Sequence, residues 1–234
     1  MKQTAVVSGA DRGLGFNLCK ALLKRGFIVF AGQYMKSWPE LKALKEANPT
    51  NLFIIPLDIS SDKSVRDAAK LVAQRTKYVD LLINCAGISG KTDDIRDGYD
   101  YQNLAMVMNT NAFGALRMIE NFLPLLDQGK KIVCSVSSEA GSIGQCWRDS
   151  EVQYCMSKAA LNMGIKILNN RLSQEGYTFK LYHPGWMKSY MTGKLDDRPD
   201  LDTEYAAQLA LKYFLDDSDQ KLVLKSYNGE CLTW

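Results

Sequence analysis

The chain contains 234 residues, of which 46% are hydrophobic and 24% are charged, a balance that is typical of a globular protein. Its 29 basic and 26 acidic residues leave a net charge of +3, which is too small to indicate binding to nucleic acid or to an anionic membrane. No apolar run approaches the roughly 18 residues of a membrane span, and residues 1–7 contain no signal-peptide core. These features predict a cytoplasmic protein with neither nucleic acid nor membrane as a partner.

In chain order, short apolar runs alternate with longer segments of helical periodicity. A first strand at 4–8 leads into a glycine-rich turn at 9–15, from which a helix runs to about residue 25. Further strands are predicted at 27–31, 52–56, 80–84, 131–136, 178–182 and 222–224. Further helices are predicted after Ser60 and Ser61, where apolar residues recur through 65–72, and at 101–126, 152–173 and 203–215.

This alternation of strands and helices predicts an α/β fold with a parallel sheet covered by helices on both faces. Right-handed crossovers then produce a doubly wound Rossmann fold, here with a parallel seven-stranded sheet and a ligand crevice at the carboxyl ends of the strands. No linker rich in Pro, Gly or Ser divides the sequence. Residues 1–234 are therefore expected to form a single domain.

The cysteine and histidine content argues against a metal site. The six cysteines form no C-x-x-C pair, and His183 is the one histidine of the sequence. A zinc site would need thiolates from scattered positions. We therefore expect no metal and free thiols in a reducing compartment, and we interpret His183, which precedes Pro184-Gly185, as a structural loop residue.

The turn after the first strand has the sequence Gly9-Ala10-Asp11-Arg12-Gly13-Leu14-Gly15. Glycines let the backbone bend sharply and approach a pyrophosphate, and the N–H groups of the opening helix point at the phosphate charge. The spacing differs from the common Gly-x-Gly-x-x-Gly fingerprint, so a turn without a ligand stays an alternative. We predict a dinucleotide site here.

The residues after the second strand bear on the choice of dinucleotide. A carboxylate there would bind the ribose hydroxyls and repel a 2′-phosphate, but residues 31–36 contain no acid. Arg12 lies in the phosphate turn and Lys36 near the end of the strand. This pattern favours NADP(H), with NAD(H) as the alternative; Arg12 could also be a solvated loop cation.

Tyr154 and Lys158 are four residues apart on a predicted helix and therefore share one face. A phenol has a pKa of about 10, whereas an acid–base catalyst works best near 7. An ammonium about 4 Å away supplies about 1 kcal/mol in water and about 4 kcal/mol at an effective dielectric near 20. In a partly dry site, Lys158 is therefore sufficient to make Tyr154 a proton donor and acceptor near neutral pH.

Four further motifs complete the pattern. Asn84-Cys85-Ala86-Gly87 follows the fourth strand, and Asn111-Ala112-Phe113-Gly114 lies in the long helix. Ser138, followed at the third position by Gly141, ends the fifth strand, and Pro184-Gly185 follows the sixth. With the glycine turn and the Tyr/Lys pair, these motifs occur in the order of the short-chain dehydrogenase/reductase family, which the chain resembles over almost its whole length. Its length and Trp234 resemble the small carbonyl-reductase-like members of the C-factor and sniffer type.

The resemblance implies roles for the matched residues. Tyr154 would be the acid/base at the substrate oxygen, and Lys158 would lower the pKa of Tyr154 and bind the nicotinamide ribose. Ser138 would hydrogen-bond the carbonyl, and Asn111 would hold a water that links Lys158 to solvent. Cofactor contacts are implied for Tyr154 and Lys158 and for Gly9, Asp11, Arg12, Gly13, Leu14, Gly15, Gln33, Tyr34, Asp58, Ile59, Asn84, Ala86, Gly87, Pro184, Gly185 and Met187.

These features favour an NADP(H)-dependent oxidoreductase that transfers a hydride between nicotinamide and a carbonyl or alcohol substrate. A regulatory sensor that binds the dinucleotide without turnover is the alternative. The loops 88–100, 139–151 and 186–200 contain aromatic and methionine side chains, which indicate a substrate with an apolar part; Arg148 and Lys188 are candidates for binding an anionic substrate. The long helices 101–126 and 152–173 slightly favour a homodimer.

Overall fold

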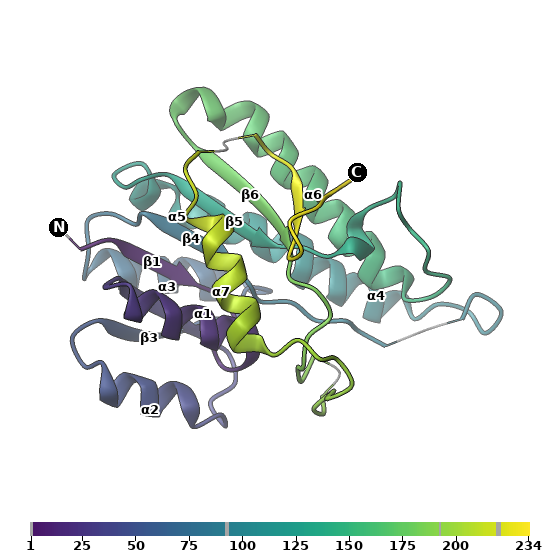
Figure 1. Ribbon diagram of the computed structural model, residues 1–234, viewed down its shortest axis with the longest axis horizontal. Coiled ribbons are helices and arrows are strands. Elements are labelled where there is room, and N and C mark those ends of the chain that lie inside the picture. Colours follow the sequence, from purple (N-terminus) through teal and green to yellow (C-terminus); the bar gives the residue numbers. More distant parts are fainter. Residues whose placement is uncertain (1, 92–93, 192, 219–220) are drawn as a thin grey trace.

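The computed structural model describes residues 2–91, 94–191, 193–218 and 221–234. In these residues, one eight-stranded sheet has the order β3-β2-β1-β4-β5-β6-β7-β8 (Figure 1). The strands are β1 (Thr4–Val7), β2 (Ile28–Gln33), β3 (Leu52–Pro56), β4 (Leu81–Asn84), β5 (Ile132–Val136), β6 (Thr178–His183), β7 (Leu224–Ser226) and β8 (Cys231–Leu232). Every neighbouring pair from β3 to β7 is parallel, and β8 is antiparallel to β7.

The helices lie on both faces of the sheet, as expected for parallel strands. They are α1 (Gly13–Lys24), α2 (Glu40–Ala47), α3 (Asp62–Ala73), α4 (Tyr101–Met108), α5 (Gly114–Leu126), α6 (Val152–Leu172) and α7 (Thr203–Phe214). Helices α1 and α7 pack side by side on one face (Figure 1), and α3 contacts α5 on the other.

Alternate residues of the strands supply the two cores. Leu82 of β4 belongs to the core under α3, α5 and α6, whereas Leu81 and Ile83 belong to the core under α1 and α7. This division follows from the two-residue period of a strand, which turns successive side chains to opposite faces. Polar side chains cap the N-termini of α3 and α7: Ser61 accepts a hydrogen bond from the N–H of Ser64 at α3, and Asp202 accepts one from the N–H of Tyr205 at α7.

The predicted fold class is confirmed, with four differences. The seven parallel strands are present, but a short hairpin adds β8, and the last parallel strand lies at Leu224–Ser226 rather than 222–224. Helix α2 was not predicted, because its eight residues bury one apolar side chain, Leu41. The predicted helix at 101–126 contains a π-helical turn at Asn109–Phe113 between α4 and α5.

Candidate active site

The ends of β1 and β4 meet at the centre of the sheet, where the strand order reverses direction. In open α/β sheets, ligands bind outside the carboxyl ends of the strands at this switch point. Most predicted site residues follow the strands β1 to β6 directly in the chain, so the topology brings them to one edge of the sheet. Asn111, Tyr154 and Lys158 lie in helical segments after β4 and β5.

The glycine turn after β1 is tightly packed against the end of β4. Gly9 has a φ of +67°, and a Cβ atom there would lie 2.8 Å from Cα of Ala86. A Cβ atom on Gly15 would lie 2.1 Å from the carbonyl oxygen of Gly9. Larger residues at either position would therefore require the backbone to move.

Helix α1 begins at Gly13, and no side chain caps its N-terminus. The first N–H groups of a helix have no partner within the helix, and they carry partial positive charge. An uncapped N-terminus beside a closely packed glycine turn fits the phosphates of a dinucleotide. The predicted residues of this turn are Gly9, Asp11, Arg12, Gly13, Leu14 and Gly15.

Two polar side chains fix the turn to the neighbouring strands. The hydroxyl of Ser8 accepts hydrogen bonds from the N–H groups of Cys85 (3.0 Å) and Ala86 (3.2 Å) after β4. Asp11 accepts hydrogen bonds from the N–H groups of Tyr34 (2.9 Å) and Met35 (2.8 Å) after β2. Burial nevertheless raises the pKa of Asp11 above its ordinary value. Both side chains therefore position the residues that would surround the cofactor.

Arg12 links the phosphate turn to the segment after β6. Its guanidinium donates a hydrogen bond to the carbonyl of Tyr190 (2.9 Å) and lies 4.8 Å from the centre of the Trp38 ring. The rings of Trp38 and Tyr190 are themselves in edge contact, with centroids 4.8 Å apart. Arg12 is therefore held by other residues and is not merely a solvated loop cation.

The remaining residues predicted to contact the adenosine half lie in different environments. Gln33 ends β2, and the next residue, Tyr34, is 67% exposed. The carboxylate of Asp58 accepts hydrogen bonds from the backbone and hydroxyl of Ser60. Ile59 is buried, and a Cβ atom on Gly114 would lie 2.8 Å from its Cδ1 atom.

The residues predicted at the nicotinamide end follow β4 and β6. Asn84 is buried and donates to the hydroxyl of Ser135 (3.3 Å). Gly87 lies close to the side chains of Asn111 and Lys158. A Cβ atom on Gly87 would be 3.6 Å from Lys158 Nζ. After β6, Pro184 and Gly185 are buried, and Met187 pairs with Leu201 in a parallel bridge.

Tyr154 and Lys158 face the same side of α6. The ammonium of Lys158 lies 5.7 Å from the centre of the Tyr154 ring, and it donates a hydrogen bond to the carbonyl of Val136 (2.9 Å). Ser138 begins the short turn Glu139–Gly141 after β5, and this turn packs against α6. The three side chains expected from sequence thus lie together where β5 ends beside α6.

The pKa values of this pair differ from the expectation. Burial raises the pKa of Tyr154 to about 12, although the neighbouring Ser138 hydroxyl opposes the increase. Burial also lowers the pKa of Lys158 to about 8. In the protein without a cofactor, desolvation of the phenol outweighs the positive charge of Arg148, and the lowering of the Tyr154 pKa by Lys158 stays a prediction.

Asn111 lies in the π-helical turn, and its carboxamide fixes the loop after β4. It accepts from the N–H of Ile88 (2.9 Å) and donates to the carbonyl of Ile88 (2.8 Å) and to the hydroxyl of Ser157 (2.9 Å). π-Helical turns are frequent at functional sites. The hydroxyl of Ser137, which directly precedes Ser138, donates to Asn162 (2.6 Å), so Ser137 is held within the protein.

A charged cluster beside Ser138 was not predicted from the sequence. Glu139 accepts a hydrogen bond from Ser138 (2.5 Å) and another from Arg148 Nε (3.2 Å). Arg148 also pairs with Glu151, so it is occupied by two carboxylates rather than available to an anionic substrate. Nδ1 of His183, at the end of β6, lies 3.3 Å from Glu139. The one feature of the sequence that could have indicated this cluster is the acidic residue directly after Ser138.

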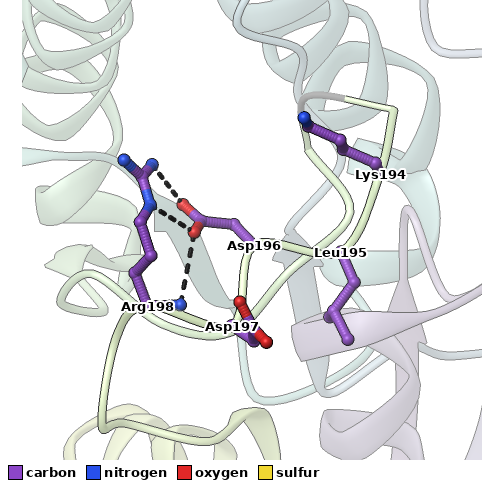
Figure 2. A pocket seen from close by; sticks show the side chains of 5 residues that line it. All are labelled: Lys194, Leu195, Asp196, Asp197 and Arg198. Atoms are coloured by element: carbon purple, nitrogen blue, oxygen red, sulfur yellow. Dashed lines mark hydrogen bonds and ion pairs between the residues drawn. The ribbon is translucent and has the colours of Figure 1, made fainter.

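Five consecutive residues after β6 line a hollow on the surface, and none of them is a predicted site residue (Figure 2). Its one ion pair joins Arg198 and Asp196, with two contacts of 2.7 and 2.9 Å. The described residues contain no group of three or more His, Cys, Asp or Glu side chains that could hold a metal ion, and no helix of this part is long and apolar enough to cross a membrane.

The family model for short chain dehydrogenases matches residues 3–200. The chain therefore belongs to the short-chain dehydrogenase family, whose members are oxidoreductases. An uncharacterized oxidoreductase of Schizosaccharomyces pombe is 32% identical over 186 residues, which cover 78% of this chain and 73% of that protein.

Two solved carbonyl reductases have the same fold along the whole chain. The NADPH-bound carbonyl reductase from chicken fatty liver is 28% identical, with a TM-score of 0.89 over 100% of this chain and 99% of that chain. The carbonyl reductase Sniffer of D. melanogaster, 24% identical, has a TM-score of 0.85 over 100% of both chains. The resemblance to carbonyl-reductase-like members is thus confirmed, while a cytoplasmic location stays a prediction.

Proposed function

We propose that the chain is an NADP(H)-dependent carbonyl reductase, which transfers a hydride between nicotinamide and a carbonyl or alcohol substrate. The observation that carries this proposal is the meeting of Ser138, Tyr154 and Lys158 beside Gly87, at the sheet edge that also holds the glycine turn. An acid–base group next to a dinucleotide site is the arrangement that hydride transfer to a carbonyl requires.

The residues present fit a dinucleotide. Side chains would not fit at Gly9 and Gly15, and the uncapped N-terminus of α1 favours phosphate. The residues predicted above would hold the cofactor, which supplies or accepts the hydride when bound. The absence of an acid at 31–36 and the NADPH bound to the chicken enzyme support NADP(H) over NAD(H).

The acid is proposed to be Tyr154. With its pKa near 12, the phenol keeps its proton at neutral pH and can donate it at the hydroxyl oxygen to a developing alkoxide. Lys158 is fixed by Val136 beneath the Tyr154 ring, where its charge would stabilise the phenolate that remains. Asn111 keeps the loop that carries Gly87 in place.

The substrate is proposed to carry an apolar or aromatic part. Trp147 and Trp186, from the two loops on the substrate side, are 77% and 61% exposed. An arginine lies against each ring: Arg148 at 5.3 Å from Trp147 and Arg198 at 5.2 Å from Trp186. These exposed rings offer flat apolar surfaces to a ketone or aldehyde.

NADPH oxidation measured over a panel of aromatic and aliphatic carbonyls tests this function. We expect turnover of at least one aromatic ketone or aldehyde and tighter binding of NADPH than of NADH. Binding of NADPH with no turnover of any compound would favour the dinucleotide sensor instead.

We also propose a homodimer. Large apolar side chains are exposed on α4, the π-helical turn and α6, namely Met106, Phe113, Met156, Met163 and Ile167. Apolar patches of this kind often mark protein interfaces. Sedimentation velocity should give the mass of a dimer, and Met163→Glu should convert it to monomer; a monomeric wild-type protein would refute this part of the proposal.

A further inference from the structure

Three buried carboxamide side chains lie against one short loop after β4, residues 88–91. They come from three elements: Asn103 from α4, Asn111 from the π-helical turn and Gln153 from α6. Asn103 is 6% exposed and Gln153 is 2% exposed. Asn111 belongs to the motifs that define the site, whereas those motifs assign no role to Asn103 or Gln153.

Asn103 and Gln153 bind the backbone at the end of the 88–91 loop. The N–H of Lys91 donates to Asn103 Oδ1 (3.3 Å), and Asn103 Nδ2 donates to the carbonyl of Lys91 (3.4 Å). Gln153 Nε2 donates to the same carbonyl and to that of Ser89 (3.5 Å). A buried amide that loses its partner costs free energy, so these hydrogen bonds fix the loop to two helices at once.

The loop passes the part of α6 that carries Tyr154. A Cβ atom on Gly87, just before the loop, would lie 3.6 Å from Lys158 Nζ. A Cβ atom on Gly90, within the loop, would lie 3.2 Å from Gln153 Cγ. Because Tyr154 lies between Gln153 and Lys158 in α6, the loop borders the helical segment of the proposed acid.

Gly90 shows how closely the loop lies against α4. Its φ of +75° is in the left-handed region that favours glycine. A Cβ atom there would lie 2.6 Å from Val107 Cγ2 and 3.1 Å from Asn103 Oδ1. The backbone of the loop is therefore packed directly on the helix that supplies one of the two amides.

An ion pair at the end of the loop is a weaker restraint than the amides. Lys91 Nζ lies 3.9 Å from the carboxylate of Asp100, which also accepts a hydrogen bond from the N–H of Asn103 (3.0 Å) at the start of α4. The side chains of Lys91 and Asp100 are 78% and 42% exposed, and exposed ion pairs contribute little to stability. The buried amides are therefore the main source of rigidity in the loop.

We propose that Asn103 and Gln153 are positioning residues, which fix the 88–91 loop as a rigid wall of the substrate site and thereby limit the carbonyl substituents that the site accepts. This inference rests on the proposed function of Tyr154 as the acid, because the loop borders the carbonyl only when the carbonyl binds at Tyr154. A loop held by amides from two helices cannot move away from a bulky group without breaking their hydrogen bonds. The favoured substrates are aromatic aldehydes and methyl ketones, whose smaller substituent faces the loop.

Discrimination between carbonyls of increasing size tests the wall. Benzaldehyde, acetophenone and isobutyrophenone carry the same ring and a second substituent that grows from hydrogen to methyl to isopropyl. Gln153→Met keeps the length of the side chain and removes the donor to the loop. The ratio of kcat/KM for benzaldehyde to that for isobutyrophenone should fall about tenfold in this variant, which is the discrimination that one methylene group provides in a fixed pocket. The affinity for NADPH should stay unchanged.

Two further variants complete the series. Asn103→Ala removes the other amide and should lower the same ratio, so it replaces Gln153→Met if circular dichroism shows that the methionine variant does not fold. Gln102→Met is the matched control, because it removes an exposed amide from the same helix as Asn103. It should leave the ratio at its wild-type value.

Amide hydrogen exchange gives an answer that does not depend on turnover. Gln153→Met leaves the hydrogen bond from the Lys91 N–H to Asn103 in place, so faster exchange of this N–H reports a looser loop. We expect exchange at Lys91 to become about tenfold faster, as for the loss of one hydrogen bond. Exchange at Ile88, whose N–H is held by Asn111, should stay the same.

These measurements separate the inference from the proposed function. Faster exchange at Lys91 in a protein that reduces no carbonyl would support the fixed loop and refute the proposed reductase. Two results would overturn the role of the two amides. One is wild-type discrimination among the three carbonyls in a folded, active Gln153→Met. The other is unchanged exchange at Lys91 in that variant, whether or not the protein reduces these carbonyls.

Discussion

The two sides of the site are built in different ways. On the cofactor side, backbone lies against backbone: the glycine turn packs on Ala86, and Ser8 and Asp11 bind main-chain N–H groups. On the substrate side, side chains from distant positions bind one another, as in the cluster of Glu139, Arg148 and His183. Backbone packing tolerates few residue types, whereas a side-chain cluster can be assembled in many ways. The difference explains how one scaffold can keep its cofactor site while its substrate changes.

The largest expected effect separates chemistry from cofactor binding. Tyr154→Phe should lower kcat for carbonyl reduction by about 10³-fold, within the range for loss of a general acid, because the proton donor is removed. The affinity for NADPH, measured by fluorescence titration, should change little. Near-normal turnover in this variant would refute the role of Tyr154 as the acid.

The next effect concerns the stability cost of Lys158. Its pKa is about 8 in the folded protein against an ordinary 10.5, so the unfolded chain binds more protons between these values and stability rises with pH across this window. Below pH 8 the full cost of about 3 kcal/mol applies.

Lys158→Met removes the ionisable group that carries this cost. Urea unfolding at pH 7 and pH 9.5 should show the wild type gaining stability relative to the variant as the pH rises. The hydrogen bond to Val136 is lost at both pH values, so it cancels in the comparison. A difference that does not depend on pH would contradict the lowered pKa.

A third change tests the backbone packing of the cofactor side. Gly15→Ala should destabilise the fold by about 2 kcal/mol, because its Cβ atom meets the Gly9 carbonyl. Gly164→Ala is the matched control: its Cβ would lie 3.2 Å from a flexible side-chain atom of Leu116. Equal unfolding free energies for the two variants would show that the turn yields more readily than its packing suggests.

The smallest expected effect lies where the two sides touch. Arg12→Ala should weaken NADPH binding about tenfold through loss of a charged hydrogen bond and leave NADH binding nearly unchanged. Because Arg12 also binds the carbonyl of Tyr190, the KM for the carbonyl should rise as well. Lys24→Ala, at the far end of α1, serves as the control; equal losses for NADPH and NADH would exclude a contact with the 2′-phosphate.

The sequence predicted those parts that depend on local pattern. Strand and helix order followed from apolar periodicity, and the glycine turn from residues that the backbone requires. The charged cluster could not be predicted, because residues 139, 148 and 183 are brought together only by the fold. The raised pKa of Tyr154 was missed for a related reason: spacing placed Lys158 on the same face, but burial of the phenol is a property of the packed site.

The π-helical turn at Asn109–Phe113 places an extra residue within an otherwise continuous helix. Each residue of an α-helix turns the following side chains by about 100° about its axis. Forcing this turn into regular α geometry with the same number of residues would rotate Met118 and Phe122 of α5 by about 100°, away from the sheet that buries them. This local irregularity therefore determines which side chains of α5 face the sheet. A redesign toward regular helical geometry at this turn would disrupt the core.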